Sequence, residues 1–170
     1  MKKVIFLNNI FIISVLSILI SGCGYKLGSM TVGGISTIAI VSVENETDKT
    51  FIEEAYVTNV LSQRFNEDGT VKVVNSSIAD ALAYIKVTKY EQNAQAFSAN
   101  DVGTDFRVII TAEVTVKSVE DEKVIYHNII QGEATYESGV DQSEIERITV
   151  KEAIKDLCID VNRAILEGGW

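Results

Sequence analysis

Residues 106–119 alternate between apolar and polar side chains almost without interruption. Successive side chains of a β-strand point to opposite faces of a sheet, so this pattern predicts an antiparallel strand with one buried face. After a polar turn at Glu120–Glu122, residues 123–136 predict the returning strand of a hairpin. Strands of about 14 residues extend roughly 45 Å, whereas most strands have about five or six residues. We therefore expect a hairpin that projects beyond its own core and is covered in part by something else.

Three further segments have the composition of strands. Residues 35–43 are β-branched and apolar on both faces, which is typical of a central strand covered on both sides. Residues 70–74 predict a short strand, and residues 81–90 predict a longer one. Together with the hairpin, these segments give a sheet of four to five strands.

Two amphipathic helices are expected, each opened by a capping box. Thr50 and Glu53 have the spacing of such a box, and apolar residues then follow at three- and four-residue intervals until Gly69, which is placed to end the helix. Ser143 and Glu146 have the same spacing at the start of a second apolar stripe. That second helix ends before the paired glycines near the C-terminus.

The order of these elements is strand, helix, a run of four strands, and helix. It indicates an α+β fold in which two helices pack on one face of a mostly antiparallel sheet. Residues 35–170 have the size of a single domain. The sequence contains no internal repeat and no low-complexity tract.

The N-terminus carries a different signal. A short basic head precedes an apolar run over residues 4–20, and Ile20–Cys23 consists of an aliphatic residue, two small residues and a cysteine. This order resembles a bacterial lipobox and predicts a signal peptide over residues 1–22, with cleavage between Gly22 and Cys23. A transmembrane helix is one alternative, but it needs about 20 apolar residues, and this run contains two asparagines. An ordinary signal peptide with a chance cysteine is the other.

Cys23 is the expected site of lipid attachment. Its thiol takes a diacylglycerol through a thioether, fatty acyl chains such as palmitate complete the anchor, and no other cofactor is expected. One acyl chain holds a protein only marginally, at about 0.8 kcal/mol per buried methylene, so two or three chains are needed for a lasting anchor. Gly24 carries no acidic signal for retention in the inner membrane. We therefore expect an outer-membrane lipoprotein with residues 23–34 as its tether.

Composition narrows the function further. The net charge of −9 at pH 7 disfavours partners such as nucleic acid and anionic membrane surfaces. The one histidine, His127, lies in the middle of a strand, and Cys158 lies on an apolar helix stripe, where a buried and inert thiol is usual. The acidic turn at Glu120–Glu122 lacks the ligand spacing of a calcium loop. We expect no enzyme, no metal site and no internal disulfide, but a binding or structural module.

Several stretches, in order along the chain, resemble the lipopolysaccharide-assembly lipoproteins of Gram-negative outer membranes. One contains Asn45 and Thr47 in the spacing of the family's F-x-N-x-T turn, and another is similar to its T-E-Y-R-L entry to the long strand. No single stretch decides the resemblance, but their shared order does. The stretches are Cys23–Gly28, Ile38–Thr47, Val71–Val74 with Ala79–Ala81, Thr104–Val108, Val150–Ala153, and Ile165–Gly168 with Trp170.

The resemblance implies a lipid-anchored α+β domain inside a large outer-membrane β-barrel, the lipopolysaccharide translocon. In that one-to-one complex the domain lies on the periplasmic side within the lumen, plugs the barrel, aids its assembly and assists insertion of lipopolysaccharide into the outer leaflet. Family members place basic residues in two stretches that read Ser98–Asp101 and Asp141–Gln142–Ser143 here, so direct phosphate pairing is not expected there. The remaining candidates for contact with the barrel or with lipopolysaccharide are Phe106, Arg107, Lys86 and Lys89.

A second class of outer-membrane lipoprotein shares part of this pattern. The stretch Ala39–Lys49, followed by a helix and by Val71–Val74, also resembles lipoproteins that activate peptidoglycan synthases or build secretion pores. The long alternating hairpin and the C-terminal helix favour lipopolysaccharide assembly over this alternative.

Overall fold

The computed structural model describes residues 34–97, 103–138 and 141–167. The predicted signal peptide, Cys23 and nearly all of the predicted tether lie outside the described residues. In chain order the elements are β1 (Thr37–Asn45), α2 (Glu54–Asp68), β2 (Lys72–Val73), the short 3₁₀ helix η1 (Ser76–Ile78), β3 (Ala81–Phe97), β4 (Gly103–Ser118), β5 (Val124–Glu137) and α3 (Gln142–Glu167).

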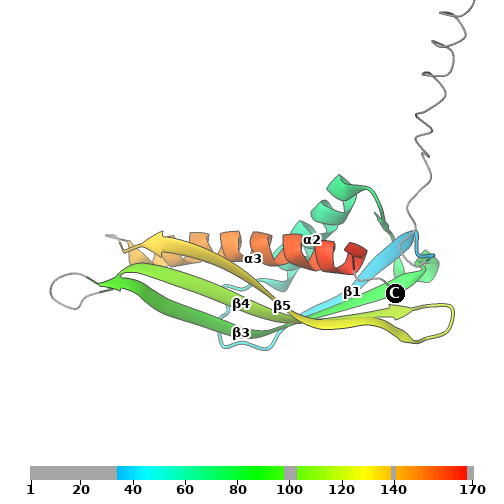
Figure 1. The fold of residues 1–170 in the computed structure, drawn as a ribbon, viewed down its shortest axis with the longest axis horizontal. Coiled ribbons are helices and arrows are strands. Elements are labelled where there is room, and N and C mark those ends of the chain that lie inside the picture. The colour runs from blue at the N-terminus through cyan, green and yellow to red at the C-terminus, as the bar shows by residue number, and fades with distance from the viewer. Residues whose placement is uncertain (1–33, 98–102, 139–140, 168–170) are drawn as a thin grey trace, which may run out of the picture.

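The five strands form one sheet in the order β2-β1-β3-β4-β5, and both helices cover the same face of it (Figure 1). The α+β fold is therefore confirmed. The sheet is mixed, because β1 pairs in parallel with both β2 and β3, whereas β3, β4 and β5 are antiparallel neighbours. The parallel pairs arise because α2 and the link through η1 each return the chain to the end of the sheet where β1 starts.

The alternation of β4 divides the sheet into a buried face and an open face. The helix-facing residues Val108, Ile110, Ala112, Val114 and Val116 are all 0% exposed. Their cross-strand neighbours on β3 are buried as well, among them Ala83, Ile85 and Val87. From above, Phe65 of α2 and Leu157 of α3 complete this core. Burial of this apolar stripe is the main favourable term for the fold.

The strands are longer than the sequence pattern predicts. β3 has 17 residues and β4 has 16, because β3 continues beyond residue 90 to Phe97 and β4 begins at Gly103. Residues 91–97 (EQNAQAF) are mostly polar, so they lack the alternation that marks a half-buried strand. The antiparallel ladder with β4 supplies their hydrogen bonds, and the pairing shifts register between Ala94 and Ala96.

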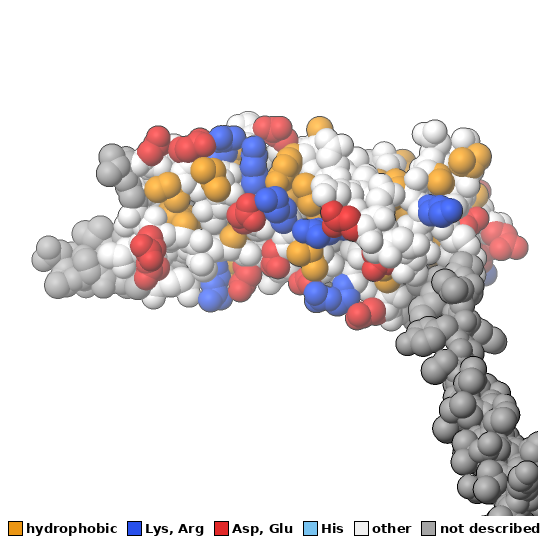
Figure 2. Space-filling model, turned by 90° about the horizontal axis from the view of Figure 1, so that it is seen from above, with side chains coloured by type: hydrophobic (Ala, Val, Ile, Leu, Met, Phe, Trp, Pro, Cys, Tyr) orange, Lys and Arg blue, Asp and Glu red, His pale blue; other side chains and the backbone are white. Residues whose placement is uncertain are grey.

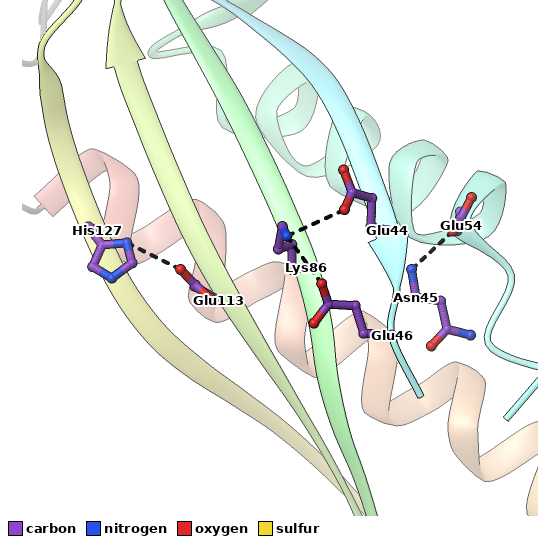
Figure 3. A network of polar contacts seen from close by, with 7 residues as sticks. All are labelled: Glu44, Asn45, Glu46, Glu54, Lys86, Glu113 and His127. Atoms are coloured by element: carbon purple, nitrogen blue, oxygen red, sulfur yellow. Dashed lines mark hydrogen bonds and ion pairs between the residues drawn. The ribbon is translucent and has the colours of Figure 1, made fainter. Parts of the chain in front are cut away.

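The first capping box is wrong. α2 begins at Glu54, and its N-cap Glu53 makes no side-chain capping bond. The preceding turn is built by Asn45, whose carboxamide oxygen accepts hydrogen bonds from the backbone N–H and the hydroxyl of Thr47 at 3.0 and 2.7 Å. The amide group of Asn45 donates to the carbonyls of Lys49 and Ile52 at 2.9 and 3.0 Å. The backbone N–H of Asn45 in turn donates to the carboxylate of Glu54 at 3.0 Å (Figure 3).

The second capping box is also displaced. α3 begins at Gln142, and the backbone N–H of Glu144 donates to the carboxylate of Asp141 at 3.3 Å. Asp141, and not Ser143, therefore caps this helix. The end of α2 agrees with prediction, since Gly69 adopts φ 74° and its N–H donates to the carbonyl of Phe65.

Replacement of Asn45 by alanine is expected to destabilise the domain by about 2 kcal/mol, because it removes four hydrogen bonds that shape one turn, each with a modest net contribution. Asp48→Ala, at an exposed position in the same turn, is the matched control and is expected to stay within about 0.5 kcal/mol of the parent. Urea denaturation measures both. Equal effects of the two substitutions would show that the Asn45 side chain does not organise this turn.

α3 lies so close to β5 that only glycine fits at position 132. A Cβ atom on Gly132 would overlap the backbone nitrogen of Leu157 and the carbonyl oxygen of Ala153. Both obstacles are backbone atoms, which cannot turn aside as a side chain can. The contact fixes the height of α3 above the sheet.

Gly132→Ala is therefore expected to lower the free energy of unfolding by about 3 kcal/mol, the upper part of the range for overpacking. Gly69→Ala is the control, because a Cβ there meets open space. This substitution is expected to lower the free energy of unfolding only by the strain of a left-handed backbone, about 1 kcal/mol. Thermal or urea unfolding of the two variants compares the costs. A larger loss for Gly69→Ala would contradict the close approach of α3.

Candidate interaction surface

The face of the sheet that is turned away from both helices, here called the open face, carries most of the predicted contact residues. Lys86, Lys89 and Arg107 all lie on it, contributed by β3 and β4. Phe106 lies on the opposite face, because adjacent residues of a strand point in opposite directions. There its ring stacks on Tyr136 at a centroid distance of 5.3 Å. The structure thus brings the three cations together on one face and separates Phe106 from them.

Each of these cations already has a carboxylate partner. The ammonium of Lys86 lies 3.1 Å from Glu46 and 3.5 Å from Glu44 (Figure 3). The hydrogen bond to Glu46 and the charges of the two carboxylates raise the pKa of Lys86 above its ordinary value. Because two carboxylates face one ammonium, this part of the open face is net negative.

The two other cations follow the same pattern. Lys89 pairs with Glu91 at 2.9 Å, and Arg107 pairs with Glu133 on the neighbouring strand at 3.5 Å. Such exposed pairs contribute about 0–1 kcal/mol to stability, so they can be exchanged for contacts with a partner at small cost. The carboxylate partners could not be identified from the sequence, because the register that joins Arg107 to Glu133 is a property of the folded sheet.

Arg107 also lines a hollow of about 480 Å³ at the projecting end of the sheet, together with Gln95, Thr135 and Glu137. Within the described parts of the chain its buried Nε atom has no hydrogen-bond partner. Asp105 lies directly opposite Glu137 across the strand pair, an arrangement of like charges that is unfavourable in an isolated sheet. Among the described residues, this end therefore has one donor without a partner and two acids, Asp105 and Glu137, that form no ion pair.

The helix side presents a different surface. Figure 2 shows this side, where lysine and arginine side chains gather in a band across the middle. Arg147, Lys151 and Lys155 follow one another at four-residue spacing along α3, and Lys151 lies 5.4 Å from the ring centroid of Tyr56. Arg147 and Lys155 each pair with a glutamate three residues earlier on the same helix.

His127 and Cys158 lie in ordinary structural surroundings. The Nδ1 atom of His127 is 3.0 Å from the hydroxyl of Thr115 and 3.7 Å from the carboxylate of Glu113. A catalytic triad needs its nucleophile and its acid on different ring nitrogens, and here both approach the same one. Cys158 is 1% exposed between the helices and the sheet, and burial raises the pKa of its thiol to about 12. The prediction of a buried thiol is confirmed.

Among the described residues, no group of three or more histidine, cysteine, aspartate or glutamate side chains is placed to hold a metal ion. None of the helices described in the structure is both long enough and apolar enough to span a bilayer.

A protein-family model described as lipopolysaccharide-assembly (LptE) matches residues 35–166. The chain belongs to this family. The resemblance predicted from the sequence is thus confirmed for nearly the whole described domain. No curated protein matches the chain significantly.

Solved structures share the fold of this LptE-family chain at low sequence identity, and the likeness shows the fold alone. One is a minor lipoprotein from Acinetobacter baumannii, with a TM-score of 0.53 and 15% identity, covering 79% of this chain and 95% of that one. Another is the hypothetical protein CT253 from Chlamydia trachomatis, with a TM-score of 0.56 and 10% identity, covering 79% and 97%. A third is lipoprotein B from Nitrosomonas europaea, with a TM-score of 0.52 and 15% identity, covering 85% and 88%.

Two of the family-like stretches have clear structural roles in this LptE-family domain. Asn45 and Thr47 build the turn that leads from β1 to α2. Thr104–Val108 lies near the start of β4 and places Phe106 against Tyr136, whose hydroxyl accepts a hydrogen bond from the side chain of Gln142 at the start of α3, while Arg107 points to the open face. The turn at Asn45 and Thr47 stabilises the fold. In Thr104–Val108, Phe106 packs on the helix side of the sheet, whereas its neighbour Arg107 lies on the open face.

The Cys158 thiol is expected to react very slowly with a thiol reagent while the domain is folded. With a pKa of about 12, its thiolate fraction at pH 8 is roughly a thousandfold below that of an ordinary cysteine with a pKa of about 8.5. Reaction with a chromogenic disulfide in a Cys23→Ser variant, with and without guanidinium, measures this difference. Equal rates in the two conditions would contradict the burial of Cys158.

Proposed function

We propose that this protein is an outer-membrane lipoprotein that forms a one-to-one complex with the large β-barrel through which lipopolysaccharide reaches the outer leaflet. In that complex the domain plugs the lumen, helps the barrel to assemble and assists insertion of lipopolysaccharide. The observation that carries this proposal is the family match over residues 35–166. The shape of the sheet supplies the physical support.

An elongated sheet suits an enclosing host. Strands of 14 to 17 residues extend roughly 45–55 Å, and neither of the described helices α2 and α3 covers the second face of the β3–β4–β5 ribbon (Figure 1). The interior of a large outer-membrane barrel is polar. An enclosed domain should therefore present polar groups to the wall, and the exchangeable ion pairs of the open face meet that requirement.

The charges of the open face bear on what it contacts. Lys86, Lys89 and Arg107 are each held by carboxylates. A lipopolysaccharide phosphate would have to displace those carboxylates and approach a net-negative surface. Contact with the barrel wall, where donors and acceptors alternate, is better matched to this face than direct phosphate binding, and we assign Lys86, Lys89 and Arg107 to the wall contact.

The lipid anchor belongs to the same proposal. A diacylglycerol on Cys23 and further acyl chains would hold the domain at the periplasmic side of the outer membrane, close to the barrel mouth. Restricting the domain to the membrane raises its effective concentration near the barrel and so favours assembly without any added contact.

Affinity purification of the full-length tagged protein in mild detergent tests the proposal. We expect a large outer-membrane barrel at one-to-one stoichiometry, bound tightly enough to survive gel filtration. Recovery of a peptidoglycan synthase or of secretion-pore components, without a barrel, would favour the alternative class instead.

The open face is tested with a matched pair of arginines. Arg107→Ala is expected to reduce barrel recovery several-fold, whereas Arg163→Ala, which removes a similarly exposed ion pair from the helix side, leaves recovery unchanged. Circular dichroism of both variants controls for folding. Equal recovery with the two variants would remove Arg107 from the contact surface.

A further inference from the structure

The end of the sheet where the described chain begins contains a hollow of about 840 Å³. It is the end at which β1 starts, β4 finishes and the β4–β5 turn lies (Figure 1). The lining includes Gly34, Ile35, Asp80, Val119, Glu120 and Ile125. These residues come from four separate segments of the chain, so the hollow exists only in the folded domain.

Apolar side chains contribute to the lining of this hollow. Ile35, Val119 and Ile125 all line it. Among the described residues, six large hydrophobic side chains are exposed, and Val119, at 43%, is one of them. Ile78, at 69%, directly precedes the lining residue Ala79 in the chain. Single exposed apolar residues are normal, whereas apolar side chains that line a concavity are typical of an interaction site.

The frame of the hollow is rigid. The carboxylate of Asp80 accepts hydrogen bonds from the backbone N–H groups of Ser36 and Thr37, both at 2.9 Å. The carbonyl of Asp80 accepts a further bond from the N–H of Val119 at 2.9 Å. Asp80 thereby ties the start of β1 to the end of β4. A preformed site of this kind loses little conformational freedom on binding.

The rim of the hollow is acidic. Glu120, Asp121 and Glu122 follow one another in the turn, and the neighbouring Lys123 is paired with Asp121 at 2.8 Å. Glu122 adopts φ 57°, a left-handed conformation in which glycine would be less strained. The chain therefore keeps a carboxylate at a position where the backbone alone favours glycine.

We propose that this hollow binds a basic and apolar polypeptide segment of the barrel partner. The inference rests on the proposed function and adds to it the end of the domain that engages the partner. Apolar side chains of the segment would cover Ile35, Val119 and Ile125, and its lysine or arginine side chains would meet Glu120 and Glu122 of the adjoining turn. An anionic bilayer is disfavoured as occupant, because the rim repels it and a concave site does not fit a flat surface.

Site-directed photo-crosslinking on the full-length lipoprotein in cells tests this assignment. A photoreactive phenylalanine replaces Val119 in one variant and Ile78 in another. Ile148, an apolar residue of α3 that is 50% exposed, is the matched control position. We expect Val119 and Ile78 to give adducts with the barrel protein, mapped by mass spectrometry to a segment rich in basic and apolar residues, at least tenfold above any adduct of Ile148 to that segment.

A double variant, Glu120→Gln with Glu122→Gly, separates binding from folding. Relief of the strained turn should leave the melting temperature unchanged or higher, while barrel recovery falls about fivefold. Asp48→Asn, an exposed acid in a distant turn, should leave recovery unchanged. A merely structural role of the acidic turn predicts full recovery with the double variant and would overturn the proposal.

The other possible crosslinking results also test the proposal. Adducts of Val119 with residues 23–33 of the same chain, with lipid, or with an acidic partner segment would each overturn the assignment, as would the absence of adducts while the complex is recovered. Failure of the wild-type protein to recover any barrel would instead contradict the proposed function, and this inference with it. The two failures are therefore distinguishable.

Discussion

The helix-facing stripe of β4, from Val108 to Val116, is removed from solvent along its whole length. It packs beneath α3, while the backbone of the same strand pairs with β3 on one side and β5 on the other. Because a strand has only two faces, burial of this stripe commits every intervening residue to the open face. The position of α3, the length of the ribbon and the chemistry of its uncovered side all follow from that one strand.

Two further contacts fix the position of α3 relative to β5. The close approach at Gly132 sets α3 directly on β5, and the carboxylate of Asp156 on α3 accepts the backbone N–H of Glu133 at 2.9 Å. That bond satisfies a donor on the free edge of β5, which is otherwise a point of aggregation for exposed strands. The side chain of Asn128 does the same for the N–H of Ile129 at 2.8 Å. The long ribbon is thus stabilised on its buried face and protected on its edge, while its open face remains available.

The distribution of charge gives the surfaces different uses. On the open face, Lys86 and Arg107 are paired across strands, and Lys89 is paired within β3. On α3, cations such as Arg147 are paired within the helix. At the end where β1 starts, Glu120 and Asp121 line a hollow that also contains apolar side chains such as Val119. A host barrel would therefore meet a polar face along the ribbon and, at one end, a hollow with both acidic and apolar side chains. The two contacts would differ in how strongly salt weakens them, because salt screens exposed charges.

The sequence by itself determined the class of the fold, the strand β4 with its turn, the end of α2 at Gly69 and the family resemblance. These features rest on local periodicity and on residues with strong conformational preferences, which act over a few positions. The sequence did not locate the helix starts. Thr50 and Ser143 have the spacing of capping residues, but the side chain of Asn45 makes the hydrogen bonds of the turn before α2, and Asp141 caps α3.

Only the tertiary structure decided the parallel pairing of β1, the extension of β3 to Phe97 and the partners of the candidate cations. It also placed Phe106 and Arg107 on opposite faces of β4 and assembled the hollow around Asp80 from distant segments. Pairing, register and concavity depend on which segments meet in space. Most of that information is absent from any short stretch of this sequence, because most of these contacts join residues that are far apart along the chain; the pair Lys89–Glu91 is an exception.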